Sequence, residues 1–572
     1  MQTEKRIIVL KFGSSVLRNE NDLPAAVHEI YRWWRDGFQV VAVVSALGNT
    51  TDELNRRAHV ACDQPNDELV AALLATGEAA SSALMGLALN RAGIFATVLD
   101  AEQAGLTTGG PVLDANLTSV DIASVLEALR DGVVVLPGFV GRSRSGKTTL
   151  LGRGGSDLTA LFLAQRLGAG CRLIKDVDGL YTSDPNAGSG PSAARFVRVS
   201  YATAARAGGA VVQLKAIDFA ECHRQRFTVS SAGSDRATEI GPYADSVALS
   251  ETHVKPLRVA LLGCGTVGGG VYQRLAALPE IFDVVGVGTR NVEHAIRAGV
   301  PVRLITTRLA ELVAEPVDVV IELLGGNEPA RTLISTALRL GNHVVTANKA
   351  LLATDLTILQ SLAANSDARI RYSAAVGGVM PALKTVKHAR SSGPLHSISG
   401  VLNGTTNFIL DQLANGSDLS DAVLAAQKNG YAERDPQADL NGTDVEQKLI
   451  LLAHAAFDVR LSSVQTQGIE NLDPTKIREA RKNGRVIRLV AECRRDTHGL
   501  VASVSPVELT LDHPLAHVSG VENRLIVQAE NERTWNVRGR GAGRWPTTEA
   551  VMGDLFDLWR VSAVAVEQEC VA

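Results

Sequence analysis

The second half of this chain opens with Leu257-Arg258-Val259-Ala260-Leu261-Leu262-Gly263-Cys264-Gly265-Thr266-Val267-Gly268. An apolar run that ends in G-x-G-x-x-G predicts a buried strand, a tight turn and the start of a helix. Gly263 permits the turn, Gly265 lets the backbone approach a pyrophosphate, and Gly268 lets helix and strand pack closely. The stretch therefore predicts a dinucleotide site in a Rossmann domain.

The end of the next predicted strand bears on which dinucleotide binds. The residues there are Val287-Gly288-Thr289-Arg290-Asn291, with no acid placed for a ribose 2′-hydroxyl. An acid at this place binds the 2′-hydroxyl of NAD, whereas an arginine accommodates the 2′-phosphate of NADP. Arg290 therefore favours NADP over NAD, although a solvated arginine would give the same pattern.

Further runs continue this alternation of strands and helices. The predicted strands cover residues 284–287, 317–324, 344–347 and 370–374, and a predicted helix at 329–340 ends before Gly341, a typical left-handed cap. Ligands bind beyond the carboxyl ends of the strands in such sheets. Lys349 follows one of these ends, in Thr346-Ala347-Asn348-Lys349-Ala350, and is therefore a candidate functional residue.

A second cluster of polar residues follows the Rossmann series. Leu402-Asn403-Gly404-Thr405-Thr406-Asn407 offers amides and hydroxyls in a predicted glycine-broken loop, and acids follow at Glu433, Asp435 and Asp439. Asp444 and Lys448 are four residues apart on a predicted helix, so they share one face. Taken alone they would be a surface ion pair. With the adjacent acids and the dinucleotide motif, they predict an active site for a small polar molecule.

The first half of the chain is another alternating series. Strand-like runs cover residues 7–13, 40–45, 133–137 and 171–176, and helical segments cover 69–89 and 157–167. The loop Leu151-Gly152-Arg153-Gly154-Gly155-Ser156-Asp157 precedes a helix, whose N-terminus attracts anions. Asp176, Asp178 and Asp184 suit contact with a Mg²⁺-nucleotide, although acids are also common in simple turns.

Length and composition limit the class of protein. The 572 residues correspond to roughly three or four domains, and 45% hydrophobic residues supply a large core. A net charge of −4 gives no case for nucleic acid or an anionic membrane as a partner. No run approaches the ~18 apolar residues of a membrane span, and residues 7–10 are too few for a signal sequence. The six cysteines form no C-x-x-C pair, which favours reduced thiols in a cytoplasmic protein.

From about residue 257 to residue 560, the ordered motifs resemble homoserine dehydrogenase. The matching segments are 263–268, 322–326, 345–352, 375–381, 398–410, 427–448 and 539–554. The resemblance implies that hydride from a nicotinamide cofactor reduces the C4 aldehyde of aspartate semialdehyde to homoserine. It also implies that Lys349 and Lys448 serve carbonyl and proton transfer, while Asp444 orients the substrate.

The same resemblance implies a set of binding residues. Glu433 and Asp439 would hold the amino group of homoserine, and the pocket would be shaped by Asn403, Gly404, Thr405 and Tyr431. The cofactor would lie against Gly263, Gly265, Thr266, Val267, Gly268, Arg290, Gly325, Lys349 and Gly541. A monovalent cation, Na⁺ or K⁺, would bind backbone groups at Val376 and Gly378. We expect this site to be weaker than in the family, because Ser373 replaces its glutamate.

Residues 6 to 242 resemble the amino-acid kinase fold and, within it, aspartokinase. The matching segments are 11–13, 44–46, 50–54, 75–78, 136–139, 152–157 and 176–185. The resemblance implies phosphorylation of aspartate by ATP with Mg²⁺. Lys11, beside Gly13, would contact the phosphates, and Asp157 would position the reacting groups. Aspartate would be held by Ser45, Thr51, Glu78 and Arg153, and the nucleotide side would be lined by Asp176, Asp178, Tyr181 and Asp184.

Several departures from the kinase pattern fall on the nucleotide side. Lys175 stands where the family has threonine, Asn186 where it has arginine, and Ala210 where it has lysine. Lys175 or Lys215 would have to replace the lost cations. Residues 241–255 leave no room for the paired ACT domains of this family, so we expect no feedback by threonine or lysine through such domains.

The sequence thus predicts an α/β protein with several domains. These are an amino-acid-kinase-like sandwich (1–245), a linker (246–256), a Rossmann domain (257–394), an α/β substrate and dimerisation domain (395–540), and a C-terminal helix, capped by Thr547, that returns to the nucleotide domain (541–572). We predict a cytoplasmic bifunctional enzyme that acts on small molecules as a homodimer or homotetramer. Two alternatives are a homoserine dehydrogenase with a kinase-like structural domain and a non-catalytic nucleotide sensor.

Overall fold

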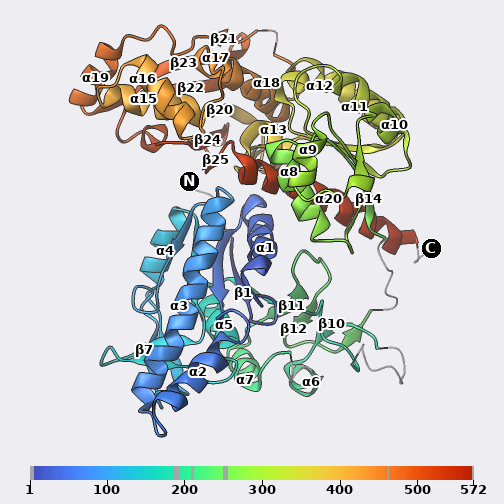
Figure 1. Cartoon of the computed structure of the whole chain (residues 1–572). Coiled ribbons are helices and arrows are strands. Elements are labelled where there is room, and N and C mark those ends of the chain that lie inside the picture. The colour runs from blue at the N-terminus through green and yellow to red at the C-terminus, as the bar shows by residue number, and fades with distance from the viewer. Residues whose placement is uncertain (1–5, 185–192, 208–210, 249–254, 462, 570–572) are drawn as a thin grey trace. The chain divides into compact units, whose positions relative to one another are not determined.

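The computed structural model describes residues 6–184, 193–207, 211–248, 255–461 and 463–569 (Figure 1). The chain divides into two compact units, with the division between residues 253 and 254. Strand β13 (Ser246–Val247) belongs to a sheet of the first unit, so the predicted linker begins within that unit. Residues 249–254, also part of the predicted linker, lie outside the described ranges.

The first unit contains a nine-stranded sheet and a four-stranded sheet. The strands are β1 (Ile7–Phe12), β2 (Gln39–Val44), β3 (Ala96–Val98), β4 (Thr107–Gly109), β5 (Asn116–Ser119), β6 (Val133–Pro137), β7 (Val140–Ser143), β8 (Thr148–Leu150), β9 (Gly170–Lys175), β10 (Phe196–Val199), β11 (Phe227–Ser231), β12 (Thr238–Ile240) and β13. Their orders are β13-β10-β12-β11-β9-β1-β2-β6-β3 and β5-β4-β7-β8.

Helices flank the larger sheet on both sides, as Figure 1 shows. They are α1 (Leu23–Arg35), α2 (Thr50–Ala61), α3 (Asp67–Arg91), α4 (Ile122–Arg130), α5 (Gly155–Leu167), α6 (Tyr201–Ala207) and α7 (Leu214–Cys222). Helix α3 packs against β2, β3 and β6, whereas α5 packs against β1, β2 and β9. Strands covered on both faces consist of nearly continuous apolar residues, as in the fully buried Val40–Val44. The predicted kinase-like sandwich is confirmed.

Helix α3 is, among the described residues, one that could cross a membrane by length and composition alone. Half of its most apolar window is buried inside the unit, and Glu78, Ser81 and Ser82 are buried along it. A core helix passes the same test, so this finding is weak evidence for a membrane.

The second unit begins with a Rossmann domain. Its six parallel strands have the order β16-β15-β14-β17-β18-β19, which confirms the predicted parallel sheet. The strands are β14 (Leu257–Leu262), β15 (Phe282–Gly288), β16 (Ile305–Thr306), β17 (Val319–Glu322), β18 (His343–Thr346) and β19 (Ile370–Arg371). The helices are α8 (Thr266–Ala276), α9 (Val292–Arg297), α10 (Leu309–Ala314), α11 (Ala330–Arg339), α12 (Lys349–Ala364) and α13 (Ser373–Gly377).

One predicted strand of this domain is too long. The sequence predicts an extended run at 370–374, but β19 ends at Arg371 and α13 begins at Ser373. The backbone N–H and hydroxyl of Ser373 both donate to the carboxylate of Asp554, at 2.8 and 2.7 Å. These two bonds turn the chain out of the sheet, which no local propensity reveals.

The second unit also holds a third large sheet, with the order β21-β23-β22-β20-β24-β25. Its strands are β20 (Leu395–Val401), β21 (Gln465–Thr466), β22 (Arg485–Asp496), β23 (Gly499–Thr510), β24 (Glu522–Ala529) and β25 (Thr534–Arg540). The associated helices are α14 (Ala382–Ser391), α15 (Gly404–Ala414), α16 (Leu419–Lys428), α17 (Gln437–Leu440), α18 (Thr443–Phe457) and α19 (Pro474–Lys482). Helices α14, α15 and α18 pack against this sheet.

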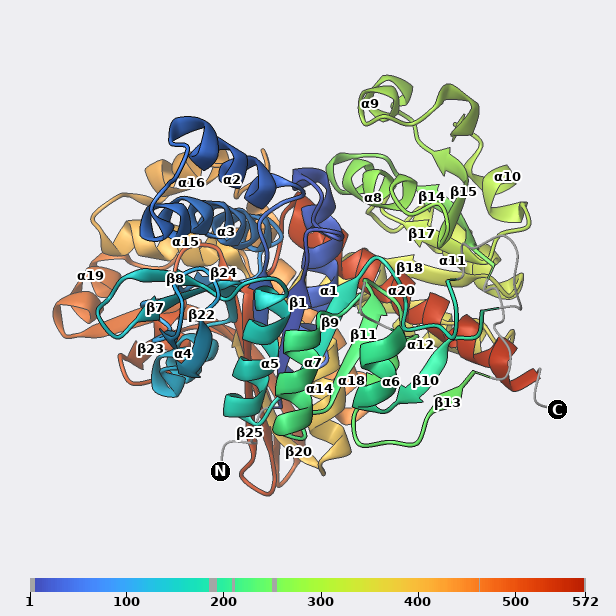
Figure 2. The ribbon, with the colours of Figure 1, turned by 90° about the horizontal axis from the view of Figure 1, so that it is seen from below.

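The last helix, α20 (Arg544–Glu569), returns to the Rossmann domain. It packs against α8, and Figure 2 shows it running beside β18. Arg274 of α8 forms an ion pair with Glu549 at 3.4 Å. The prediction that Thr547 caps this helix was wrong: the helix begins at Arg544, and the Thr547 N–H bonds the Gly543 carbonyl from within its first turn.

Candidate active sites

The turn after β14 has the geometry that a dinucleotide requires. Gly263 has a φ of 97°, and a Cβ there would lie 2.6 Å from the Leu323 carbonyl oxygen. A Cβ on Gly268 would lie only 1.9 Å from the Gly263 carbonyl oxygen. A Cβ on Gly265 would meet nothing within 4 Å, so its backbone faces open space at the N-terminus of α8. The glycines therefore have three separate roles: turn, close packing and open approach.

The carboxyl ends of β17 and β18 lie beside the turn that follows β14, at the same edge of the sheet. Glu322 is fully buried and accepts hydrogen bonds from the Thr346 hydroxyl, at 2.6 Å, and from the N–H groups of Leu324 and Gly325. Gly325 has a φ of 72°, with nothing within 4 Å of a Cβ. The Asn348 amide donates to the Gly326 carbonyl at 2.6 Å. Fixed turns beside unfilled space fit a bound nicotinamide dinucleotide.

Arg290 follows the end of β15 and is exposed. Strand β16 pairs with β15, with Gly288 opposite Thr306, and Arg308 comes two residues later. The Arg308 N–H donates to the Thr306 hydroxyl, and its guanidinium lies 3.3 Å from exposed Glu311. Sequence reasoning missed Arg308, because the two-residue strand β16 is too short to recognise.

A Lys–Asp–Lys cluster connects the Rossmann domain to the third sheet's helices. Lys349 is the first residue of α12, and its Nζ lies 2.9 Å from Oδ1 of Asp444 in α18. The other oxygen, Oδ2, lies 2.8 Å from Nζ of Lys448, one turn later. The Lys448 ammonium also donates to the Leu402 carbonyl at 2.7 Å. The predicted shared face of Asp444 and Lys448 is thus present, and Lys349 is brought to it.

The electrostatics of this cluster keep Asp444 ionised. Burial tends to raise the pKa of Asp444, but Lys448 and then Lys349 outweigh burial and hold it well below the usual range. The Asp444 carboxylate in turn raises the pKa of Lys349. Asp439, by contrast, has its pKa raised, chiefly by burial. The cluster therefore holds two ammonium groups against one firmly charged carboxylate.

The residues around Asn403 differ from the predicted loop. They form the start of α15, whose N-cap is Asn403: its side-chain oxygen accepts from the Thr406 N–H at 2.8 Å. An asparagine ahead of a helix is a typical cap. The amide nitrogen of Asn403 donates to Asp439 at 2.6 Å and to Asp444 at 2.8 Å. Asn403 thus holds two acids of the predicted site together.

Tyr431 and Glu433 lie at the outer edge of the predicted substrate pocket. The Thr405 hydroxyl donates to the Tyr431 carbonyl at 2.7 Å, and the Tyr431 ring packs edge-on against Phe408. Tyr431 is 42% exposed, and Glu433 is exposed. Glu433 still contributes to the raised pKa of Lys349, after Asp444 and Asp439. Gly404 fits closely: a Cβ there would lie 2.8 Å from Val521.

Asn523 is a buried contact that sequence reasoning missed. Its amide nitrogen donates at 2.9 Å to the same Leu402 carbonyl that Lys448 contacts. A Cβ on Gly541 would lie 1.7 Å from this nitrogen, so the glycine makes room for Asn523. Only the pairing of β24 with β20 brings Asn523 beside Leu402, and that pairing is not a local signal.

The segment predicted to bind a monovalent cation is tightly packed. Val376 is fully buried in α13, and Gly378 has a φ of 54°. A Cβ on Gly378 would lie 2.8 Å from the carbonyl oxygens of Arg540 and Gly541. Ser373 provides no carboxylate, and its hydroxyl donates to Asp554. The described residues contain no cluster of three or more His, Cys, Asp or Glu side chains of metal-binding type.

The first unit has its own buried charge cluster. Lys11 on β1 and Lys175 at the end of β9 both contact Asp157 in the first turn of α5, with N–O distances of 2.8 Å. All three side chains are at most 10% exposed. A Cβ on Gly13 would lie 2.8 Å from the Lys11 ammonium, so Gly13 leaves space for it. Burial, and then Lys11, lower the pKa of Lys175 to about 8.

The predicted aspartate-binding residues surround the end of β2. Glu78 on α3 is 2% exposed, and burial raises its pKa to about 8. Its Oε2 atom has no hydrogen-bond partner among the described residues. The Ser81 hydroxyl, one turn along α3, donates to the Ser45 carbonyl at 2.6 Å. Thr51 lies in the first turn of α2.

The remaining predicted kinase residues lie at exposed turns. Arg153 is exposed in the loop before α5, and Asp176 and Asp184 are exposed after β9. The Tyr181 hydroxyl donates to Asp178 at 2.7 Å. Lys215 is engaged elsewhere: its ammonium donates to Asp114, Ala115 and Leu151. Asn186 and Ala210, two of the departures from the kinase pattern, lie outside the described residues.

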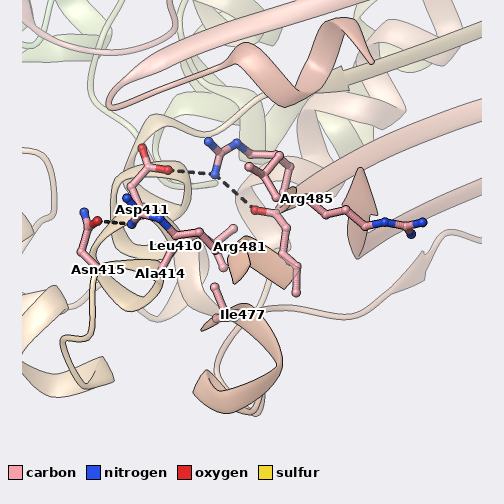
Figure 3. Close-up of a pocket in the computed structure, with 10 residues that line it drawn as sticks. Leu410, Asp411, Ala414, Asn415, Ile477, Arg481 and Arg485 are labelled. Atoms are coloured by element: carbon pink, nitrogen blue, oxygen red, sulfur yellow. Dashed lines mark hydrogen bonds and ion pairs between the residues drawn. The ribbon is translucent and has the colours of Figure 1, made fainter. Parts of the chain in front are cut away.

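A pocket of 340 Å³ on the second unit is lined by none of the predicted site residues (Figure 3). Its lining residues come from α15, α19 and β22. Its cations have protein partners: Arg488 pairs with Asp411 at 2.9 Å, Arg481 bonds Asn415, and Arg485 pairs with Glu508. The five described cysteines are not in disulfides.

Both halves of the chain match known protein families. Residues 6–228 match the amino acid kinase family, residues 263–373 the NAD-binding domain of homoserine dehydrogenase, and residues 381–556 homoserine dehydrogenase itself. The homoserine dehydrogenase of Synechocystis sp. is 36% identical over 316 residues, covering 53% of this chain and 73% of the relative. That of Mycobacterium tuberculosis is 37% identical over 318 residues, covering 53% and 72%.

A solved structure supports the same assignment. The homoserine dehydrogenase of Thiobacillus denitrificans is 34% identical, with a TM-score of 0.52, and the match covers 54% of this chain and 74% of that one. The predicted fusion of a kinase-type domain with a homoserine dehydrogenase is confirmed by the family matches. The chain therefore belongs to the homoserine dehydrogenase family, as an NAD(P)-dependent oxidoreductase joined to an N-terminal domain of the amino acid kinase type.

Proposed function

We propose that the cluster of Lys349, Asp444 and Lys448 interconverts aspartate semialdehyde and homoserine. The observation that supports this most strongly is that each lysine contacts a different oxygen of one buried carboxylate. The two lysine ammonium groups are therefore held in place before substrate binds, and preorganised charge is a large contributor to catalysis.

When bound, the nicotinamide cofactor supplies the hydride that adds to C4 of the aldehyde. The oxygen of that aldehyde then becomes an alkoxide and needs a nearby cation and a proton. We assign the proton to Nζ of Lys448, which is 7% exposed and is oriented by Asp444 and the Leu402 carbonyl. Lys349, 38% exposed, would stabilise the developing negative charge from the nucleotide side.

The amino group of the substrate requires carboxylates. We propose Glu433 and Asp439 for this role, since both lie close enough to Lys349 to raise its pKa. Asn403 would act as a positioning residue, because its amide nitrogen already donates to Asp439 and Asp444. Thr405, Gly404 and Tyr431 would form the wall of the pocket.

For the first unit, we propose phosphorylation of aspartate by ATP with Mg²⁺. Glu78 supports this reading, since a buried carboxyl with an unpartnered oxygen suits the ammonium of an amino acid. Lys11, at the carboxyl end of β1, suits phosphate contact, and Asp157 in the first turn of α5 holds its ammonium in place. The alternative, a kinase-like domain kept for structure, predicts no turnover.

Several finer properties belong to this proposal. We propose a preference for NADP, carried by Arg290 and Arg308 at the ends of the adjacent strands β15 and β16. We also propose a cytoplasmic location and a homodimeric or homotetrameric state. The mass of the purified protein in solution would test the oligomeric state. A monovalent cation at Val376 and Gly378 would be revealed by a rate that rises with added K⁺ or Na⁺.

One set of assays on a single preparation tests the main proposal. Homoserine-dependent reduction of NADP⁺ and aspartate-dependent turnover of ATP would be measured side by side. Both activities are expected. The first activity alone would support the structural-domain alternative, and neither activity would support the nucleotide-sensor alternative.

A further inference from the structure

Two buried ammonium groups share one carboxylate in the kinase-type unit. Strands β1 and β9 are parallel neighbours, with Lys11 opposite Leu173, so Lys11 and Lys175 lie near the same edge of the sheet. Lys11 contacts Oδ1 of Asp157 at 2.8 Å, and Lys175 contacts Oδ2 at 2.8 Å and Oδ1 at 3.2 Å. The carboxylate thus fixes the positions of both cations.

This arrangement leaves positive charge without a full counterpart. Two lysine side chains contact the single carboxylate of Asp157, at 2.8 Å each. Burial raises the pKa of Glu78, an acid that also interacts with Lys11, so Glu78 offsets less of this positive charge than an ordinary carboxylate would. Asp176 is exposed and contributes only weakly to Lys175. A buried excess cation is costly unless an anion completes the site.

Of the two lysines that could replace the missing cations of the kinase pattern, Lys175 is the one that contacts Asp157. Lys215, the other lysine that could replace the missing family cations, donates to three oxygens of the 114–115 and 151 region. Lys175 instead faces Asp157 in the first turn of α5, where the helix dipole favours anions. Lys175 therefore supplies a cation beside the N-terminus of α5.

We propose that Lys175 is a phosphoryl-binding residue, which with Lys11 grips the transferred phosphate from two sides. This inference rests on the proposed kinase function. In the reaction, a β-carboxylate oxygen of aspartate forms a bond to the γ-phosphorus. The bond from that phosphorus to the bridging oxygen breaks, and ADP leaves with the electron pair. No proton needs to move, so the two lysines act through charge alone.

Binding measurements separate this role from a structural one. ADP and a non-hydrolysable imido analogue of ATP, each with Mg²⁺, would be titrated into the full chain and into Lys175→Met. We expect the variant to bind the ATP analogue about 10-fold to 100-fold more weakly, with ADP affinity unchanged. Equal weakening of both nucleotides would indicate a structural role and overturn the proposal. Unchanged binding of both would also overturn it.

Turnover provides an independent measurement. In Lys175→Met, kcat for aspartate-dependent ATP turnover should fall by ~10²-fold, the scale of losing one charge-stabilising group. Lys175→Arg, which keeps the charge, should recover much of that loss. Lys147→Met is the matched surface control, since Lys147 is exposed and pairs with exposed Glu68.

The outcomes distinguish the two proposals. Wild-type protein without turnover, but with analogue binding that depends on Lys175, would overturn the kinase function and leave the phosphate site standing. ATP turnover that is present in wild-type protein and survives in Lys175→Met would support the kinase function and overturn the phosphate-binding role of Lys175. Wild-type protein that binds neither nucleotide would overturn both.

Discussion

Nζ of Lys349 lies 2.9 Å from Oδ1 of Asp444, which joins the first residue of α12 to the first turn of α18. This contact ties the nucleotide-binding sheet to the helix that carries Lys448. Because Lys448 occupies the other oxygen, Asp444 sets the positions of both cations at once. The ion pairs therefore position the chemistry, whatever their net contribution to stability.

Replacing Asp444 by asparagine tests this positioning. Asp444→Asn keeps the size of the side chain but removes the charge, so both lysines lose their shared partner. We expect kcat for homoserine oxidation to fall by ~10²-fold or more, with a smaller change in the KM for NADP⁺. Asp435→Asn is the control, because Asp435 is exposed and its side chain accepts from the Gln437 N–H in the local turn. Equal effects of the two substitutions would count against the account.

The glycines of the nucleotide turn predict two different defects. Gly265→Ala adds a Cβ where no protein atom lies within 4 Å, so the melting temperature should hardly change. The methyl group would occupy space proposed for the pyrophosphate, and NADP⁺ affinity should fall by ~10-fold or more. Gly268→Ala should instead destabilise the fold by about 1–3 kcal/mol, because its Cβ would overlap the Gly263 carbonyl. Thermal melts and cofactor titrations of both variants distinguish the two roles.

Arg290 gives a prediction on cofactor choice. Arg290→Ala should raise the KM for NADP⁺ by ~10-fold, the usual scale of a lost charged hydrogen bond, and leave the KM for NAD⁺ nearly unchanged. Arg308→Ala should act in the same direction. Kinetics with both cofactors provide the internal control, and an equal change for NAD⁺ and NADP⁺ would remove the basis for a 2′-phosphate site.

Glu78 predicts a pH dependence of stability. Its pKa is raised in the folded protein, from an ordinary 4.5 to about 8, so the folded state binds the proton more tightly than the unfolded state. This contribution is fully present below pH 4.5 and is lost as the pH rises through about 8. Each tenfold difference in proton affinity between the two states corresponds to about 1.4 kcal/mol. The free energy of unfolding of the wild-type protein should therefore fall relative to that of Glu78→Gln as the pH rises from 4.5 to about 8. Parallel pH profiles would show that Glu78 does not titrate in this way.

Much of the fold follows from local sequence patterns. The strand at β14, the helix α18 and the glycine turn at Gly263 all have signals within a few residues, and the structure has them as predicted. One error comes from a distant contact: Asp554, on the last helix, accepts hydrogen bonds from Ser373 just after strand β19 ends. The other is local, since Asn403 caps α15 through the Thr406 N–H where a loop was predicted.

In the candidate sites too, some residues could be predicted from local spacing, whereas others depend on contacts that only the fold creates. The spacing of Asp444 and Lys448 predicts their shared helix face, because four residues make about one turn. Spacing could not decide between Lys175 and Lys215 at the kinase site, since that choice depends on which acid each ammonium reaches. Asn523 and Arg308 depend on strand pairing, so their positions emerge only from the folded sheet.

The most decisive measurement is the rate of homoserine-dependent NADP⁺ reduction in Lys448→Ala. Lys448 is the buried ammonium assigned to proton transfer, so kcat should fall by at least ~10²-fold while NADP⁺ still binds. A variant that folds, binds NADP⁺ and turns over at nearly the wild-type rate would contradict the proposed site.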